Sequence, residues 1–333
     1  MIFSYGVTVC GPAHEAEGIP CQDAHETAKL PDGAAVGAVA DGLGSEKHSG
    51  MAAELAVRIV TRHCAKHIKA DMGDADILRV LRDSFRIAQN AIEAEAGKKN
   101  FDLDQCDTTL TVAVLSGGRL YYGHSGDSGA IALTENGLYL KVTEQQRDDL
   151  GRVFPLYFGE EKWVFGKFPS RVAGVLLATD GLLETFCPIY LQDEPVALYV
   201  ALLRFFTDRS GMEKDGESAA EARIHSFVSG IPADKVSDDK TVVVLLDNDV
   251  PVAEQPPEYY DEPDWDELKE KWKNAYRKKA YPHLFQDDGY IAPEKADVLP
   301  SLGVNNATRR IAEEEEPENS AAAIIQINYS NEV

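Results

Sequence analysis

The chain has 333 residues, 44% of them apolar and 27% charged, which is typical of a soluble globular protein with a sizeable core. Its net charge of −23 argues against nucleic acid and anionic membrane surfaces as partners, since both would repel an acidic protein. The five cysteines form no C-x-x-C pair, and we find no signal peptide or membrane-spanning run, so we expect a cytoplasmic protein with reduced thiols.

The N-terminal part of the chain alternates apolar strands with two long helices. Alternation predicts a strand at 2–10, and an apolar run that ends in a glycine turn predicts another at 34–44. The segment 13–22 between them is expected to be a loop. Apolar residues recur at helical spacing over 48–70 and 74–97, so we expect two helices that form one layer.

The middle of the chain is rich in strands. Two hairpins are predicted, each made of two apolar segments around a glycine turn, whereas region 145–170 shows no regular pattern. The elements expected here are strands at 108–115, 120–124, 130–133, 138–142, 172–178 and 241–246 and helices at 196–206 and 218–228.

Acidic residues border the most apolar strands. They are Asp23, Asp41, Asp127, Asp180 and Asp238. Acids are common at strand ends because they favour turns and caps, but that explains only one or two of them. Several carboxylates at one sheet edge repel each other and require a cation, and hard oxygen ligands suit Mg²⁺ or Mn²⁺. Two such ions close together favour hydrolysis of a phosphate ester, because they bind phosphoryl oxygens and lower the pKa of a shared water.

Five short motifs occur in order along the chain. They are Gln22-Asp23-Ala24, Asp41-Gly42-Leu43-Gly44, Thr108-Thr109 with Gly126-Asp127-Ser128, Ala178-Thr179-Asp180-Gly181-Leu182, and Asp238-Asp239-Lys240-Thr241. Together they resemble the metal-dependent protein phosphatases of type 2C, in a divergent bacterial branch, over roughly residues 1–248. The resemblance implies an α+β fold, a four-layer α-β-β-α sandwich of two central antiparallel sheets flanked by helices. The metal ions would lie in the cleft between the sheets.

The resemblance also implies which residues hold the metals. Asp41 would bridge two Mg²⁺ or Mn²⁺ ions, and the carbonyl of Gly42 would contact one of them. Asp180 and Asp238 would hold the other ion, so that Asp41, Asp180 and Asp238 are the expected catalytic residues.

Two further acids complete the expected metal set. Asp23 would act through water, and Asp127 together with Asp180 would hold a weaker third ion.

The chain departs from the family pattern at three positions. Gly18 stands where many members carry an arginine that grips the substrate phosphate, Leu43 replaces the histidine of the eukaryotic type, and Gln22 replaces a glutamate. His14 or Lys47 is a candidate phosphate contact instead, although a lone histidine or lysine in a loop is more often simply solvated.

Three functions are compatible with these residues. The preferred one is a phosphoserine/phosphothreonine protein phosphatase that acts on a phosphorylated protein and opposes a cognate kinase. The missing arginine and the acidic surface favour the alternative of a pseudophosphatase, a binding module with the same fold and little or no turnover. The third is a hydrolase of small phosphate esters or nucleotides on the same metal site.

Composition changes after the catalytic segment. We expect a type 2C phosphatase-like domain at 1–249, a linker rich in proline and acidic residues at 250–263, and a C-terminal extension at 264–333. Tryptophans at helical spacing predict one amphipathic helix over 265–281, packed on the catalytic domain or serving as a docking helix for an acidic partner. The acidic run 313–316 indicates a partly disordered tail.

Overall fold

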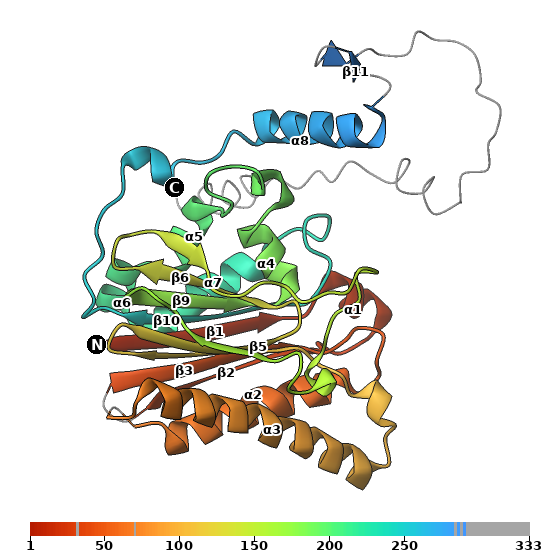
Figure 1. Ribbon diagram of the computed structural model, residues 1–333, viewed down its shortest axis with the longest axis vertical. Helices are drawn as coiled ribbons and strands as arrows, with labels where there is room; N and C mark the ends of the chain where they lie inside the picture. Colours follow the sequence, from red (N-terminus) through yellow and green to blue (C-terminus); the bar gives the residue numbers. More distant parts are fainter. Residues whose placement is uncertain (31–32, 70, 283–284, 287–288, 291–333) are drawn as a thin grey trace, which may run out of the picture.

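Two antiparallel sheets stacked face to face form the centre of the protein (Figure 1). The structure, a computed structural model, describes residues 1–30, 33–69, 71–282, 285–286 and 289–290. Each central sheet has five strands, and helices cover the outer faces of both. Among the described residues, no helix is both long enough and apolar enough to cross a bilayer.

The first sheet joins the N-terminal strand to strands from the second half of the chain. In spatial order its strands are β1 (Ile2–Val9), β10 (Lys240–Asp247), β9 (Val172–Ala178), β6 (Gly129–Thr134) and β7 (Tyr139–Lys141). The middle strands β9 and β10 are buried along their whole length. Strands covered on both faces have to be apolar on both faces, which explains their continuous Val and Leu runs.

The second sheet is built mainly from the first half of the chain. Its strands are β2 (Asp23–Leu30), β3 (Ala34–Asp41), β4 (Leu110–Ser116), β5 (Arg119–Ser125) and β8 (Val164–Lys167). Its inner face packs against the first sheet through small and branched side chains such as Val39, Leu115, Val175 and Val243. Alanines and valines dominate β3, so that the two sheets approach closely.

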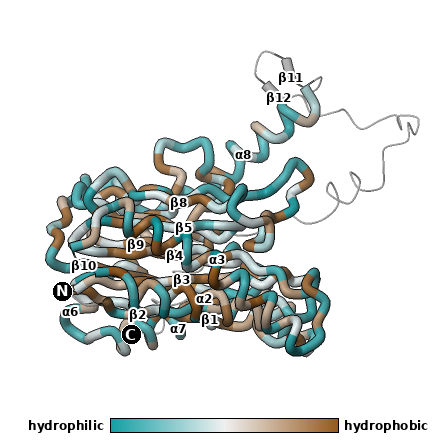
Figure 2. Tube along the Cα trace, turned by 60° about the horizontal axis from the view of Figure 1, so that its bottom comes forward, coloured by the Kyte–Doolittle hydropathy of each residue, from teal (hydrophilic) through white to brown (hydrophobic). Residues whose placement is uncertain are grey.

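Helices form the two outer layers. The helices are α1 (Pro12–Glu17), α2 (Ser49–His67), α3 (Asp74–Lys99), α4 (Asp180–Phe186), α5 (Val200–Phe206), α6 (Arg209–Asp215), α7 (Glu217–Ser229) and α8 (Trp265–Ala280), with short 3-10 turns at Leu103–Gln105, Leu156–Phe158, Ile189–Leu191 and Pro257–Tyr260 and a small hairpin of β11 (Phe285–Gln286) and β12 (Gly289–Tyr290). Helices α2 and α3 share a core with the second sheet, and α4 to α7 share one with the first. Figure 2 shows mostly apolar strands between more hydrophilic outer segments. The predicted four-layer α-β-β-α sandwich is confirmed.

One local expectation differs from the structure, and one short helix had not been expected. The segment 13–22 is not a simple loop, because α1 fills its first half: Pro12 lies in the first helical turn and Gly18 ends the helix at φ 70°. Six residues are too few to show a helical period, so the pattern gave no sign of it. A second short helix, α4, begins directly at Asp180 after β9.

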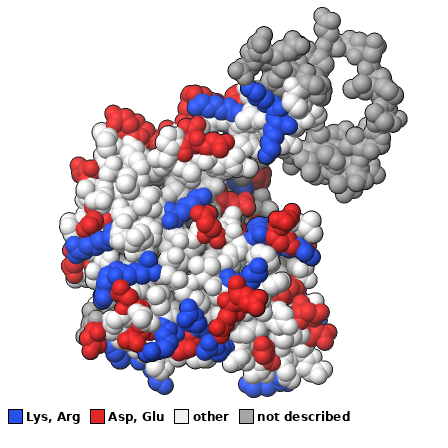
Figure 3. Space-filling model, in the orientation of Figure 1, with Lys and Arg blue, Asp and Glu red and all other residues white. Residues whose placement is uncertain are grey.

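The C-terminal helix α8 begins where Asp264 caps it, since the Asp264 carboxylate accepts a hydrogen bond from the Glu267 N–H at 3.0 Å. Trp265 is buried and meets the ring of Tyr199 edge-on at 5.0 Å between centroids. Basic side chains gather at α8 in Figure 3, whereas acidic and basic groups are interspersed over the body of the protein. The expected acidic tail at 313–316 lies outside the described residues, and the domain boundaries stay predictions.

Candidate metal centre

Four of the acids expected at the site stand where strands of the two sheets begin or end. Asp41 is the last residue of β3, and Asp180 follows β9 after one intervening residue. Asp127 lies between β5 and β6, and Asp238 lies just before β10. One carboxylate oxygen from each of Asp41, Asp127 and Asp180 lies within 4.8 Å of the other two. The fold therefore gathers residues far apart in sequence at one end of the sandwich.

The turn after β3 is held by backbone contacts that leave no room for a side chain. The Asp41 carbonyl accepts a hydrogen bond from the Thr109 N–H at 2.8 Å, and the Gly42 N–H donates to the Gln22 carbonyl at 3.1 Å. A Cβ on Gly42 would lie 2.6 Å from the carbonyl carbon of Ser49 at the start of α2. Glycine is therefore required for the Asp41 turn to fit between β2 and α2.

Asp23 faces Asp41 across the β2–β3 pair, in register. The Thr179 hydroxyl donates a hydrogen bond to the Asp23 carboxylate at 2.7 Å and accepts one from the Thr241 N–H at 3.1 Å. Burial raises the pKa of Asp23 well above its usual range, the Thr179 hydrogen bond opposes this rise, and the charge of Asp239 adds to it. Asp23 is thus a fixed, buried acid beside Asp41.

Burial and mutual repulsion make the central acids hard to ionise together. Burial raises the pKa of Asp41, and the charges of Asp23, Asp180, Asp127 and Asp238 raise it further. Burial also raises the pKa of Asp180, with Asp238 as the next cause. The pKa of Asp127 rises to about 6 through burial and the charge of Asp180, against the lowering effect of Arg147. Such a set of carboxyls is stabilised by a cation between them.

Arg147 supplies a cationic group at this cluster. A guanidinium nitrogen of Arg147 lies 2.5 Å from Asp127 Oδ2 and 3.4 Å from Asp180 Oδ2. The other oxygen of Asp127, Oδ1, is buried without a hydrogen-bond partner. Sequence reasoning missed Arg147, because it lies in the region 145–170 that shows no regular pattern.

The adjacent acids Asp238 and Asp239 have different surroundings. The Asp239 carboxylate accepts hydrogen bonds from the backbone N–H of Gly11 at 2.6 Å and of Gln22 at 2.7 Å. Burial alone would raise the pKa of Asp239, but these hydrogen bonds and the nearby His14 lower it below its usual value. Asp239 therefore ties α1 and β2 to β10. The motif Asp238-Asp239-Lys240-Thr241 gave no indication of this role for Asp239.

Asp238 interacts electrostatically with the cluster instead. Its charge raises the pKa of both Asp180 and Asp41, which places it within electrostatic reach of them. The close approach depends on Gly181, because a Cβ there would collide with the Asp239 carbonyl oxygen. Only a glycine lets the start of α4 lie against the Asp238–Asp239 segment.

The expected phosphate contacts occupy different settings. His14 lies in α1 with Nδ1 3.0 Å from Asp239 Oδ2, so its ring is directed at that carboxylate. Lys47 is exposed in the turn before α2. Gly18, where many relatives carry arginine, is exposed at the end of α1. The roles of His14 and Lys47 in phosphate binding stay predictions.

The donor set fits a hard divalent ion. It consists of carboxylate oxygens from three segments of the chain. One oxygen of Asp127, Oδ1, is buried and has no hydrogen-bond partner. Mg²⁺ and Mn²⁺ take oxygen ligands of this kind. The cluster is therefore a candidate metal centre, and the ligand roles of Asp23, Gly42 and Asp238 stay predictions.

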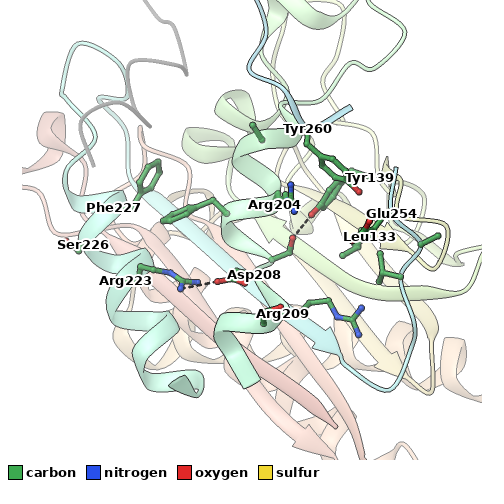
Figure 4. Close-up of a pocket in the computed structure, with 17 residues that line it drawn as sticks. Leu133, Tyr139, Arg204, Asp208, Arg209, Arg223, Ser226, Phe227, Glu254 and Tyr260 are labelled. Carbon is green, nitrogen blue, oxygen red and sulfur yellow. Dashed lines mark hydrogen bonds and ion pairs between the residues drawn. The ribbon is translucent and has the colours of Figure 1, made fainter. Parts of the chain in front are cut away.

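A separate cavity of about 1140 Å³ lies at the end of β6 that is away from Asp127, and Figure 4 shows residues that line it. Strand β6 begins beside Asp127 and reaches the cavity wall at Leu133. Each arginine of the wall has a partner: Arg204 lies over the ring of Tyr260, Arg209 donates to the carbonyls of Asp247 and Val250, and Arg223 pairs with Asp208 at 3.3 Å. These contacts hold each of the three arginines in place at the cavity wall.

Comparison with known sequences decides the family. The model of the family described as protein phosphatase 2C matches residues 10–228. The chain belongs to the protein phosphatase 2C family. In this phosphatase 2C chain the match includes Asp23, Asp41, Asp127 and Asp180, and Asp238 follows its end. A search of curated proteins finds no match to the sequence.

Three bacterial serine/threonine phosphatases are among the solved structures with the same architecture. The serine/threonine phosphatase PstP/Ppp of Mycobacterium tuberculosis is 22% identical, with a TM-score of 0.51 over 74% of this chain and 98% of that one. PppA of Pseudomonas aeruginosa is 18% identical, with a TM-score of 0.51 over 74% of this chain and 97% of that one. The S. agalactiae serine/threonine phosphatase is 14% identical, with a TM-score of 0.50 over 74% of this chain and 100% of that one. At these identities the likeness shows a shared fold.

Proposed function

We propose that this phosphatase 2C family member hydrolyses phosphoserine and phosphothreonine in a metal-dependent reaction. The observation that carries the proposal is the convergence of Asp41, Asp127 and Asp180 within 4.8 Å. Asp41, Asp180 and Asp238 would hold two Mg²⁺ or Mn²⁺ ions, with the Gly42 carbonyl as a further ligand. Bound there, the ions would supply Lewis acidity to the phosphate and lower the pKa of a water.

The surrounding residues would keep this site in shape. Thr179 orients the Asp23 carboxylate, and Asp239 ties α1 to the entrance of β10. The backbone fit around Gly42 fixes the direction in which Asp41 leaves β3. Each acid would thus be held in place before an ion arrives, so that little reorganisation is needed on binding.

We propose that the substrate is a phosphorylated protein. A serine/threonine kinase would add the phosphate groups that this protein removes. Family membership supports this class of reaction. The same centre would accept small phosphate esters or nucleotides if the surrounding surface contributed nothing to selection. Turnover of a phosphopeptide compared with that of a nucleotide separates the two substrate classes.

A pseudophosphatase is the second candidate, and one observation favours it. The position of the phosphate-gripping arginine is Gly18, which offers no side chain at the exposed end of α1. Without an arginine side chain to bind the phosphate, the protein would still bind a phosphorylated partner. It would hydrolyse the phosphate slowly or not at all.

The deciding experiment is Mn²⁺-dependent hydrolysis of p-nitrophenyl phosphate and of a phosphothreonine peptide. The wild type is expected to be active, and Asp41→Asn and Asp180→Asn are expected to lose at least about a hundredfold in rate. Asp266→Asn, an exposed acid in the first turn of α8, is the matched control and should keep full activity. Equal inactivity of all four proteins with every divalent metal would leave the binding module as the function.

A further inference from the structure

The loop between β7 and β8 brings Arg147 to the carboxylate cluster, and hydrogen bonds hold the start of this loop in place. The Gln146 N–H donates to the Gly126 carbonyl at 2.8 Å, and the Gln146 side chain accepts from the Gly126 N–H at 3.0 Å. The neighbouring Gln145 amide donates to the Asp127 carbonyl at 2.9 Å. The backbone next to Arg147 is therefore attached to the segment that carries Asp127.

The other end of this loop is open to solvent. Arg147 pairs with Val153 through the backbone, which closes a small hairpin, and Leu150 at its tip is 78% exposed. The Arg147 side chain is itself 38% exposed. The guanidinium can thus move from the carboxylates into water while the backbone of residues 145–146 stays in place.

The Arg147 guanidinium lies against carboxylate oxygens that would hold a metal ion. Arg147 is 2.5 Å from Asp127 Oδ2 and 3.4 Å from Asp180 Oδ2, and Glu184 of α4 also interacts with its charge. A Mg²⁺ ion bound to both aspartates would need its ligand oxygens at about 2.0–2.1 Å. Two cations cannot occupy that space together, by size or by charge.

We propose that Arg147 is an internal competitor of a divalent ion on the Asp127–Asp180 side of the cluster. Its guanidinium neutralises the two aspartates while no ion is bound between them, and an ion that binds there displaces it into solvent. The proposal rests on the proposed function, namely that the cluster is a metal centre. An ion between Asp127 and Asp180 would therefore bind more weakly than the two carboxylates alone would allow.

The test is calorimetric titration of Mn²⁺ into the metal-free full chain, which needs no substrate. Arg147→Ala is expected to bind the ion on the Asp127 side about tenfold more tightly than wild type, as removal of one competing charge contact implies. The double variant Arg147→Ala with Asp127→Asn should lose that gain. Arg152→Ala is the matched control: Arg152 lies in the same hairpin but pairs with Asp148 at 2.7 Å.

The outcomes separate this inference from the proposed function. Mn²⁺ affinity and stoichiometry that are equal in wild type and Arg147→Ala overturn the inference alone, as does an equal gain in Arg152→Ala. Absence of Mn²⁺ binding in every variant overturns the inference and the metal-dependent function together. Thermal unfolding of each metal-free protein verifies that the variants are folded.

Discussion

Asp23 and Asp41 lie directly opposite each other on β2 and β3, so a buried carboxyl and a half-buried one share one position of an antiparallel ladder. Like charges in such a pair are destabilising. The pair therefore lowers the stability of the metal-free protein, an effect that a bound cation would relieve.

Substitution of Asp23 by asparagine tests this relationship. Asp23→Asn removes one charge and keeps an oxygen that can accept the Thr179 hydrogen bond. We expect the metal-free variant to be more stable than wild type by about 1 kcal/mol at pH 7.5. Urea unfolding in the presence of a chelator measures the difference, with Asp266→Asn as the exposed control. A less stable Asp23→Asn protein would contradict the repulsion.

Asp127 makes the stability of the metal-free protein fall as pH rises. Its pKa is raised from 3.8 to about 6 by burial, so between these values the folded state binds more protons than the unfolded state. A carboxyl whose pKa is raised in the folded state lowers the free energy of unfolding as pH rises through the interval between its two pKa values. For Asp127 this loss amounts to about 3 kcal/mol between acid and neutral pH. Urea unfolding from pH 4 to pH 7.5 should show a steeper decline in wild type than in Asp127→Asn. Identical slopes would show that Asp127 ionises normally.

His124 has the opposite dependence on pH. Burial lowers its pKa from 6.5 to about 4, and its two ring nitrogens lie 2.9 Å from the Thr111 hydroxyl and 3.0 Å from the Glu144 carbonyl oxygen. The neutral ring donates to Glu144 and accepts from Thr111. Because the unfolded state takes up the proton first, acidification from pH 7 to pH 5 should remove about 2 kcal/mol of stability.

The variant His124→Gln isolates that contribution. The variant should be less stable than wild type at pH 7. On acidification it should lose less unfolding free energy than wild type, because the contribution of His124 is absent. The quantity compared is the change in unfolding free energy between the two pH values, so that the carboxyl contributions cancel. An unchanged pH slope in His124→Gln would mean that the folded state accepts the proton on His124.

Gly42 tests how tightly the Asp41 turn is packed. Gly42→Ala would put a Cβ 2.6 Å from the backbone carbonyl carbon of Ser49. We expect this clash to lower the free energy of unfolding by about 1–3 kcal/mol and to weaken Mn²⁺ binding. Gly97→Ala is the matched control in α3, where a Cβ meets nothing within 4 Å and alanine should be neutral or stabilising. Thermal unfolding and Mn²⁺ titration measure the two effects, and wild-type values for Gly42→Ala would show that the turn can relax.

Much of the fold was accessible from the sequence because its signals are local. The apolar runs 34–41 and 172–178 form β3 and β9, and helical spacing located α2 and α3 to within a few residues. The layer arrangement was implied only by the resemblance of the five motifs to the type 2C phosphatases. Short helices such as α1 and α4 had no detectable period.

The sequence by itself determined that Asp41, Asp127 and Asp180 would each stand at a strand border, because strand periodicity and glycine turns are properties of neighbouring residues. Only the tertiary structure decided that Arg147 would reach Asp127 and Asp180, and that Asp239 would tie backbone segments together while the charge of Asp238 acts on Asp180. Contacts between distant segments follow from how the two sheets stack, and an ion pair between loops leaves no periodic trace in the chain.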